Sequence, residues 1–261
     1  MRSPRKVALV TGASGGLGLE FATLLARDGY DLALVARSQA KLGEIAAGLR
    51  REHGVDVRPV ALDLARPDAA DALAEQIGRC DVLINNAGFG SHGRFDRIDE
   101  ERIEREIVLD VLTLTRLTRK YLPAMVERKD GKVLNVASTA GFLPGPFMAV
   151  YYASKAYVVS FSQALADELR GSGVSITCFC PGATRTGFAA RAGSQDSLLN
   201  RVLPVADAKT MARAGYRAMQ RGALVAVPAP AMNWFVDLSA RITPRRLLLW
   251  FSRKAVEVEG R

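Results

Sequence analysis

Three residues, Ser138, Tyr151 and Lys155, have the types and the spacing needed to polarise a carbonyl and to move a proton at its oxygen. Tyr151 and Lys155 are four residues apart in a run from Val150 to about Leu169 that can form one helix, so their side chains share a face. A tyrosine has an ordinary pKa of about 10, and a neighbouring ammonium group favours the phenolate and lowers that pKa. Ser138 follows an apolar segment, residues 133–137, that is typical of a buried strand. We therefore expect the serine to polarise a carbonyl and the tyrosine to give or take the proton.

The same spacing has a simpler interpretation, which is an ordinary helix surface. Tyr152 lies three residues before Lys155 and is also within helical reach of it, while Tyr157 lies just beyond and is expected to pack. Periodicity alone does not decide which phenol is paired with the lysine.

A glycine-rich turn follows the first predicted strand, residues 6–10. The turn, Thr11–Gly18, has the sequence TGASGGLG, and a helical pattern follows it to about Gly29. Strand, glycine turn and helix in this order are typical of a dinucleotide site, because glycines let the backbone approach a pyrophosphate at the positive end of a helix. The spacing differs from the usual G-x-G-x-x-G pattern, so the turn alone is weak evidence.

The end of the second predicted strand indicates the choice of cofactor. Neither Ala36 nor Arg37 is acidic, although an acid for the ribose 2′-hydroxyl is usual at this place. Arg37 suits a 2′-phosphate, which predicts NADP(H) in preference to NAD(H); the alternative is a solvated arginine on a loop. Asp63 and Leu64 follow a third strand, near residues 57–62, where the adenine ring could lie, although an aspartate there is commonly a turn or cap residue.

Two further motifs make a resemblance specific. A fourth predicted strand leads into Asn85–Gly88, with the sequence NNAG, and a later one leads into Pro181–Thr186, with the sequence PGATRT. Together with the glycine turn, the serine and the Tyr-x-x-x-Lys pair, in this order and spacing, they resemble the short-chain dehydrogenase/reductase superfamily over roughly residues 5 to 190.

The resemblance implies roles for individual positions. Ser138 would orient the carbonyl, Tyr151 in preference to Tyr152 would be the acid–base group, and Lys155 would also hold the nicotinamide ribose. The residues predicted to bind NADP(H), from the turn, the strand ends and the resemblance together, are Gly12, Ser14, Gly15, Gly16, Leu17, Gly18, Arg37, Asp63, Leu64, Asn86, Ala87, Gly88, Pro181, Gly182, Thr184 and Thr186.

Asp110 departs from the family pattern. Many members have an asparagine on the fourth helix, whose backbone carbonyl holds a water molecule in a proton relay to the lysine, and Asp110 stands at that place here. If the main-chain carbonyl does this work, aspartate can replace asparagine with little loss, and its charge could assist Lys155. The alternative is a loss of activity. Asp110 is included in the predicted catalytic set.

Composition and patterning predict one α/β domain over residues 1–261. The chain has 261 residues, of which 49% are hydrophobic, and strands alternate with helices from Lys6 to Cys180, as expected of a Rossmann-like, doubly wound parallel sheet with helices on both faces. There is no apolar signal-peptide core and no apolar run near the ~18 residues of a membrane span, so we expect a cytoplasmic location.

The distribution of charge and the numbers of cysteine and histidine argue against nucleic-acid binding and metal binding. The net charge of +9 is spread among acidic residues and no DNA-binding module is recognised, so no nucleic-acid partner is expected. The three cysteines and two histidines are too few and too scattered to predict a metal site.

The substrate region is the least informative part of the chain. The resemblance implies that residues 188–204 form a variable substrate lid, and the polar residues at its start do not identify a ligand. Apolar and aromatic residues near the motifs predict a pocket for a hydrophobic ketone or alcohol; they are Phe89, His92, Phe95, Phe142, Leu143, Phe147 and Met148.

The C-terminal part, about residues 230–261, is expected to be a helical extension that is both apolar and basic. Pro244 should break or restart a helix after residues 232–242. It precedes an apolar patch, residues 247–251, bracketed by Arg245, Arg246, Arg253 and Lys254. Two interpretations are open. The segment packs on the protein or on a second subunit, or residues 244–254 make peripheral contact with a membrane, with Trp250 and Phe251 inserted shallowly into lipid.

The sequence therefore predicts an NADP(H)-dependent carbonyl reductase or alcohol dehydrogenase that transfers a hydride between nicotinamide and a ketone or secondary alcohol. One alternative is a non-catalytic dinucleotide sensor on the same fold, and another is a different reaction such as epimerisation or dehydration. The resemblance also implies a homo-oligomer, formed through helices at residues 99–128 and 151–170.

Overall fold

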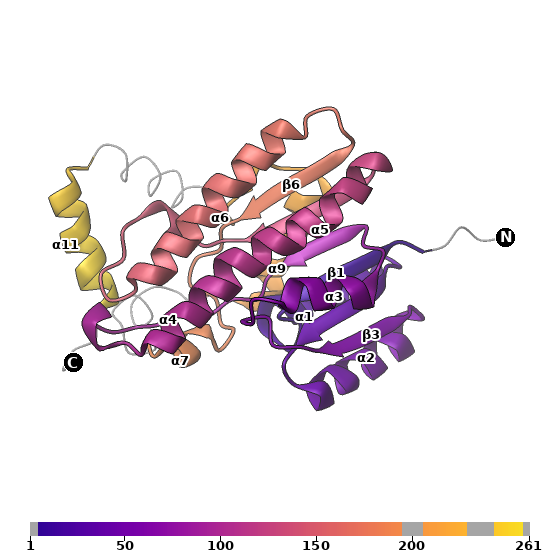
Figure 1. Ribbon diagram of the computed structural model, residues 1–261, viewed down its shortest axis with the longest axis horizontal. Helices are drawn as coiled ribbons and strands as arrows, with labels where there is room; N and C mark the ends of the chain where they lie inside the picture. Colours follow the sequence, from indigo (N-terminus) through magenta and orange to yellow (C-terminus); the bar gives the residue numbers. More distant parts are fainter. Residues whose placement is uncertain (1–4, 195–205, 229–242, 258–261) are drawn as a thin grey trace.

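The computed structural model describes residues 5–194, 206–228 and 243–257, and its centre is a seven-stranded parallel sheet (Figure 1). The strand order is β3-β2-β1-β4-β5-β6-β7, and every neighbouring pair is parallel. The strands are β1 (Val7–Thr11), β2 (Asp31–Ala36), β3 (Val57–Ala61), β4 (Val82–Asn85), β5 (Gly131–Val136), β6 (Val174–Phe179) and β7 (Val225–Ala226).

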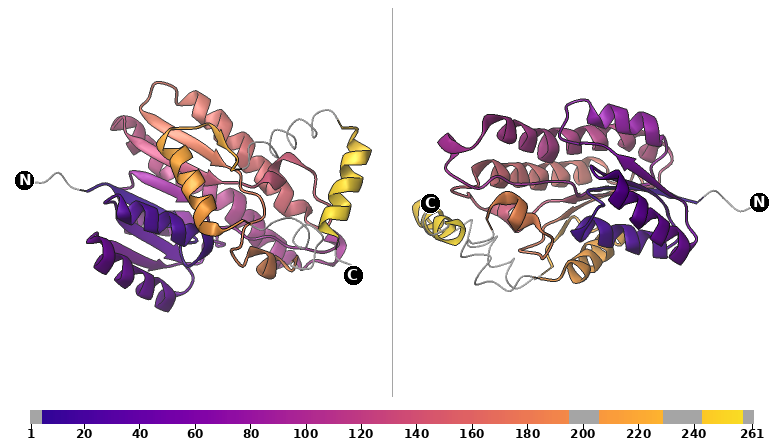
Figure 2. Two further views of the ribbon diagram at one scale, coloured as in Figure 1. Left: turned by 180° about the vertical axis from the view of Figure 1, so that it is seen from behind. Right: turned by 90° about the horizontal axis from the view of Figure 1, so that it is seen from below.

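Helices cover both faces of the sheet, with α3, α4, α5 and α6 on one face and α1, α2 and α9 on the other (Figures 1 and 2). Their bounds are α1 (Gly16–Arg27), α2 (Gln39–His53), α3 (Ala69–Ile77), α4 (Glu100–Ile107), α5 (Leu114–Glu127), α6 (Ala149–Glu168), α7 (Phe188–Ala192), α9 (Ala208–Gln220) and α11 (Arg245–Val256). Short turns of helix are η1 (Phe95–Arg97), η2 (Val108–Thr113) and η3 (Thr139–Phe142). The predicted doubly wound α/β fold is confirmed. The short edge strand β7 was not predicted.

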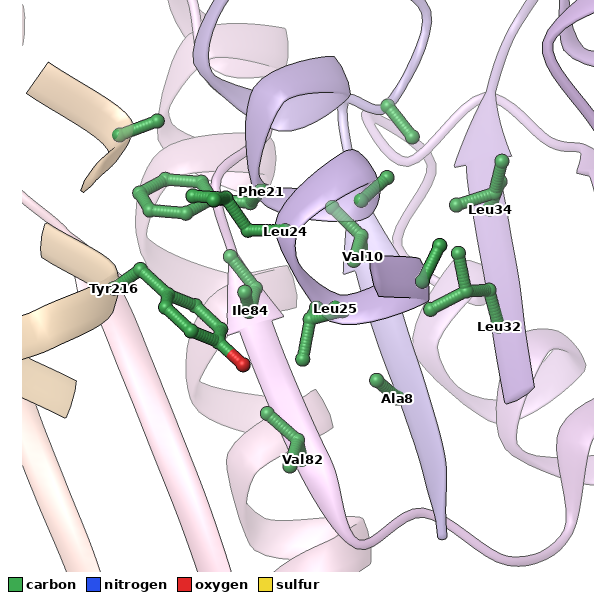
Figure 3. Close-up of a cluster of buried hydrophobic side chains, with 14 of the residues drawn as sticks. Ala8, Val10, Phe21, Leu24, Leu25, Leu32, Leu34, Val82, Ile84 and Tyr216 are labelled. Atoms are coloured by element: carbon green, nitrogen blue, oxygen red, sulfur yellow. The ribbon is translucent and has the colours of Figure 1, made fainter. Parts of the chain in front are cut away.

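An apolar layer between α1 and the sheet fixes the helix that follows the glycine turn. Figure 3 shows Phe21 and Leu25 of α1 facing the side chains of β1 and β4, with Tyr216 of α9 beside them. The rings of Phe21 and Phe179 meet edge to face with centroids 6.1 Å apart. Full burial of a side chain of this size contributes about 2 kcal/mol to the free energy of unfolding. The layer therefore holds the start of α1 at the carboxyl end of β1.

Hydrogen bonds from Thr11 and Asn86 join the carboxyl ends of β1 and β4. The Thr11 hydroxyl donates to the carbonyl of Ile84 (3.2 Å) and accepts from the amides of Asn86 (2.9 Å) and Ala87 (3.0 Å). The Asn86 side chain donates to the carbonyl of Thr11 (2.9 Å). The strand order reverses between β1 and β4, which is where open α/β sheets bind ligands. The NNAG motif thus lies beside the glycine turn at the edge expected to bind a cofactor.

A buried chain of polar side chains orients α6 on the sheet. The Asn85 amide donates to Asn135 Oδ1 (2.9 Å), and the Asn135 amide donates to Ser162 Oγ (3.0 Å) on α6. All three residues are buried, so each hydrogen bond also prevents the cost of an unpaired polar group. The chain of bonds fixes the height of α6, and with it the positions of Tyr151 and Lys155.

Two predicted segments differ from expectation or are only partly described. The helix expected over residues 99–128 is interrupted by the π-helical η2 between α4 and α5. Of the expected lid, residues 195–204 lie outside the described residues, as do 229–242 and 258–261 of the C-terminal extension. Within the described part of the chain, no helix combines the length and apolar character required to cross a bilayer.

The contact between α1 and the glycine turn gives a stability prediction. A Cβ at Gly18 would lie 2.3 Å from the carbonyl oxygen of Gly12, whereas a Cβ at Gly15 would find Lys41 Nζ at 3.9 Å as its nearest neighbour. We expect Gly18→Ala to lower the free energy of unfolding by about 1–3 kcal/mol because the backbone must shift, and Gly15→Ala to cost less than about 1 kcal/mol. Urea unfolding measures both. Equal losses would show that α1 moves freely away from the turn.

Candidate active site

The structure brings Ser138, Tyr151 and Lys155 to the carboxyl end of the sheet. Ser138 follows β5 and caps η3, where its hydroxyl accepts from the amide of Ala140 (3.1 Å) and donates to the carbonyl of Pro181 (3.4 Å). Tyr151 and Lys155 lie in the first two turns of α6, with Lys155 Nζ 5.5 Å from the centre of the Tyr151 ring. All three predicted catalytic side chains therefore line one site.

The electrostatic balance at Tyr151 differs from the expectation. Burial raises the pKa of the phenol, the Lys155 ammonium and a hydrogen bond with Ser138 oppose this rise, and the nearby carboxyl groups of Asp110 and Glu106 add to it. The net pKa lies above its ordinary value, so the predicted net lowering is wrong. Desolvation exceeds the attraction of one cation here, and Lys155 limits the rise.

Tyr152 has different surroundings from its neighbour. It is buried, burial raises the pKa of its phenol to about 12, and its ring packs so closely on Gly145 that a Cβ there would lie 2.2 Å from Tyr152 Cδ2. Tyr157 is also a packing residue, because its ring stacks on Phe161 with centroids 5.5 Å apart. Lys155 lies against Tyr151, so the structure settles the pairing that periodicity left open.

Lys155 forms a buried ion pair with Asp110. Lys155 Nζ lies 3.0 Å from Asp110 Oδ2, and the two residues are only 5% and 1% exposed. Asp110 Oδ1 accepts from the amide of Phe89 (3.2 Å), and Lys155 also donates to the carbonyl of Val136 (3.4 Å). Burial lowers the pKa of Lys155, but Asp110 and Tyr151 outweigh it and the net pKa is raised. Burial also raises the pKa of Asp110, against the attraction of Lys155.

The backbone around this pair is shaped to admit it. Asp110 lies in the π-helical η2, a distortion that occurs frequently at functional sites. A Cβ at Gly88 would lie 3.0 Å from Asp110 Oδ1 and 3.2 Å from Lys155 Nζ. Glycine in the NNAG motif therefore leaves the room that the ion pair occupies, and the carboxylate itself contacts the lysine.

Glu106 belongs to this charged group, and sequence reasoning missed it. Its side chain is fully buried on α4, four residues before Asp110. Burial raises the pKa of Glu106 to about 7; Asp110 also raises it, whereas Arg102 and Lys155 oppose the rise. Two acids four residues apart, with an otherwise apolar stretch between them, share a helix face and could have signalled the site.

The glycine turn and the start of α1 fit the diphosphate of a dinucleotide. The N-terminus of α1 has no side-chain cap hydrogen bond and no acidic residue in its first turn, so its N–H groups are available to an anion. Gly12 and Gly16 have φ values of +68° and +56°, and a Cβ at Gly16 would lie 2.9 Å from Thr186 Cβ. Side chains at these positions would fill the cradle, so the turn suits the close approach of phosphates.

Three other residues predicted to bind cofactor, Arg37, Asp63 and Leu64, follow the carboxyl ends of β2 and β3. Arg37 is exposed directly after β2 and acts on Asp63. Although burial raises the pKa of Asp63, a 2.6 Å bond from Arg105, the amide of Ala65 and the charge of Arg37 hold it below its ordinary value. Leu64 is a core residue, whose carbonyl accepts from the Thr113 hydroxyl. A direct cofactor contact by Arg37, Asp63 or Leu64 stays a prediction.

The motif after β6 forms the opposite wall. Pro181 is buried and bonded to Ser138, while Thr184 Oγ1 donates to the carbonyl of Gly182 (2.9 Å) and Thr186 Oγ1 donates to that of Thr184 (3.3 Å). Ser14 and Leu17 lie in the glycine turn and the first turn of α1. These internal bonds give the loop a defined shape next to the cradle.

Apolar side chains from distant parts of the chain gather around Tyr151. The Phe188 ring of α7 lies 5.0 Å from the Tyr151 ring, and a Cβ at Gly90 would lie 3.0 Å from Met148 Cε and 3.1 Å from Phe188 Cζ. We call this group the Tyr151 cluster; its members are Ala140, Leu143, Phe147, Met148, Tyr151, Tyr152, Phe188, Ala192, Ala255 and Val256.

The expected pocket residues are only partly in this cluster. Leu143, Phe147 and Met148 belong to it, whereas Phe142 packs in a different core cluster and Phe95 is exposed. A surface cleft of about 380 Å³ between α1 and α9 contains none of the candidate catalytic residues. No group of His, Cys, Asp or Glu within the described ranges could hold a metal ion.

Comparisons with known proteins show the family to which the chain belongs. Residues 6–197 match the short chain dehydrogenase family. The chain is a member of that family. The short-chain dehydrogenase is 37% identical, over 65% of its length and 52% of the relative's, to the very-long-chain 3-oxoacyl-CoA reductase of Laccaria bicolor. It spans only about half the length of the curated relatives it matches.

Two solved structures extend the likeness over almost the whole chain. A short-chain dehydrogenase from Sphingobium yanoikuyae in complex with NADPH is 38% identical, covers 90% of this chain and 93% of its own, and superposes with a TM-score of 0.82. The bulky-bulky ketone specific alcohol dehydrogenase from Comamonas testosteroni is 30% identical, with coverages of 92% and 93% and a TM-score of 0.79. A nicotinamide cofactor is thus the family's cofactor, as predicted.

The buried carboxyl of Glu106 predicts a pH-dependent stability. Its pKa rises from an ordinary 4.5 to about 7, so the folded protein holds a proton that the unfolded chain releases, and stability falls as pH rises through that window. Gln cannot ionise. Glu106→Gln should match the natural protein near pH 5 and exceed its free energy of unfolding by up to about 3 kcal/mol near pH 8.

Urea unfolding at the two pH values makes the measurement, with Glu104→Gln, an exposed residue of the same helix, as the control. Glu104→Gln should show no such difference between the two pH values. A Glu106→Gln effect that is the same at both would mean that folding does not raise the pKa of Glu106.

Proposed function

We propose that this short-chain dehydrogenase is an NADP(H)-dependent ketoreductase, which interconverts a hydrophobic ketone and the corresponding secondary alcohol. The observation that carries the proposal is the set of contacts around Tyr151: a hydrogen bond with Ser138 and the adjacent ammonium of Lys155, itself paired with Asp110. The names of the relatives support a reductase, since one acts on 3-oxoacyl-CoA and another is specific for bulky ketones.

The bound cofactor supplies or accepts the hydride, and the protein's own side chains handle the proton. A raised pKa keeps Tyr151 protonated near neutral pH, which suits donation to a carbonyl oxygen. Ser138 offers a second donor to the same oxygen. As the proton leaves, the Lys155 ammonium stabilises the phenolate, and Asp110 keeps that ammonium charged. These roles favour the reductive direction at neutral pH.

The Tyr151 cluster supports an apolar substituent on the substrate. Phe188 and Met148 lie close to the Tyr151 ring, and Val256 of α11 belongs to the same cluster. An alkyl or acyl chain buried there would gain about 25 cal/mol per Å² of apolar surface. A ketone with a bulky apolar group, including a 3-oxoacyl chain, is the substrate class we propose.

Exposed apolar side chains on the outer helices support the proposal of a homo-oligomer. Ile107, Leu112, Val126 and Tyr157 are all exposed on α4, η2, α5 and α6, the helices expected to meet a second copy. Scattered exposed apolar residues are common on monomers, so the size of the native particle is the test.

Tyr151→Phe tests the proposed reaction. It should reduce kcat for NADPH-dependent ketone reduction by at least ~100-fold, because the proton donor is removed, while NADPH affinity is nearly unchanged. The measurement is NADPH consumption with a panel of bulky ketones, together with a binding titration. Tyr152→Phe, which alters only packing near the site, is the matched control and should be mild.

Equal losses in the two variants would contradict the pairing of Lys155 with Tyr151. A natural protein that binds NADPH but turns over no ketone would instead favour the non-catalytic sensor.

Arg37→Asp tests the cofactor preference. A charged hydrogen bond to the 2′-phosphate is worth about 1.5–3 kcal/mol, so reversing the charge should lower the ratio of kcat/KM for NADPH to that for NADH by at least ~10-fold. Arg51→Asp makes the same charge change at an exposed position of α2 and should leave the ratio almost unchanged. An unchanged ratio in Arg37→Asp would make Arg37 a surface residue only.

A further inference from the structure

The outer face of α11 exposes a set of large apolar side chains. Leu247, Trp250 and Phe251 are 51%, 54% and 59% exposed, and Leu249 elsewhere on the same helix is 42% exposed. The rings of Trp250 and Phe251 contact edge to face, with centroids 4.9 Å apart. An isolated exposed leucine needs no explanation, but two contacting aromatic rings with a leucine one turn before them on the same helix face form a patch that is typical of an interaction site.

The inner face of the same helix already packs on the protein. Leu248, Ser252 and Val256 recur every four residues and are buried. The carbonyl of Val256 lies 2.9 Å from His92 Nε2, and the Arg253 guanidinium lies 5.0 Å from the centre of the Phe147 ring. The buried stripe of Leu248, Ser252 and Val256 therefore anchors the helix. The exposed apolar stripe of Leu247, Trp250 and Phe251 has no partner within the described residues.

The charges of α11 distinguish an anionic surface from a second copy of the chain. Arg245, Arg246, Arg253 and Lys254 are exposed, and the helix contains no acidic residue. Among the described residues, Lys254 pairs with Glu257, just after the end of the helix. Two copies meeting through this face would bring the cations of both helices together. An anionic phospholipid surface complements them instead.

The position of α11 places this face next to the proposed substrate site. Figures 1 and 2 show α11 at one end of the molecule, outside the layers that cover the sheet. Val256 and Ala255 at its end belong to the Tyr151 cluster. A surface that contacts the outer stripe of α11 would therefore lie beside the apolar group around the catalytic phenol.

We propose that α11 is a membrane-contact helix that lays Leu247, Trp250 and Phe251 into the surface of an anionic phospholipid bilayer. An apolar stripe flanked by cations is the pattern of helices that lie in the lipid interface without crossing it. Delivery of a lipid-dissolved ketone to the Tyr151 cluster follows from this contact, and that part alone rests on the proposed function.

Vesicle co-sedimentation of the full chain tests the contact. The natural protein should bind vesicles of phosphatidylcholine with phosphatidylglycerol, bind pure phosphatidylcholine weakly, and lose binding as salt screens the headgroups. The double variant Trp250→Ser with Phe251→Ser should lower the bound fraction at least ~5-fold, because the inserted area is lost. Leu224→Ser, at an exposed leucine outside α11, is the matched control and should bind as the natural protein does.

Three results would overturn the proposal. The first is that the natural protein fails to bind the anionic vesicles, and the second is that the double variant binds them equally well. The third is that the double variant changes from oligomer to monomer in size-exclusion chromatography, which would assign the face to a second copy. Turnover of a water-soluble ketone by the double variant should equal that of the natural protein. This assay needs no vesicles, so a failure of the proposed ketoreductase activity is seen separately from a failure of membrane contact.

Discussion

The buried ion pair between Lys155 and Asp110 is the interaction on which the site depends. Burial of either charge alone is costly, and removing one partner of such a pair typically costs about 3–5 kcal/mol. The 3.0 Å contact is supported by an amide bonded to Asp110 and a carbonyl bonded to Lys155. A charged lysine beside a buried phenol is then the result of the fold, and the acid–base chemistry proposed for Tyr151 needs both.

Short-range patterns in the sequence were sufficient to predict the parts of the site that are formed by neighbouring residues. The strands are apolar runs, the glycine turn follows the first of them, and Tyr151 and Lys155 share a helix face because they are four residues apart. Family resemblance placed Asp110 near the lysine. It did not reveal that the aspartate side chain itself forms the ion pair, since that contact requires the π-helical turn and the space left at Gly88.

The features that were missed depend on packing between distant segments. Glu106 is charged in isolation, and only the packing of α4 within the fold buries it and raises its pKa to about 7. Burial raises the pKa of Tyr151, and a residue as far along the chain as Phe188 packs against its ring. The two faces of α11 likewise cannot be separated by sequence, because both are apolar; burial of Leu248 and exposure of Phe251 distinguish them.

The pH dependence of kcat for ketone reduction, compared between the natural protein and Asp110→Asn, tests the central claim most directly. In the proposed reaction, reduction needs a protonated Tyr151 and a charged Lys155. Asp110 raises the pKa of both groups, so its loss should move the alkaline limb of the profile to lower pH, with most activity kept at the acidic end. An unchanged alkaline limb would contradict the account, as would a gain in kcat of about a hundredfold, which would mark the natural site as catalytically impaired.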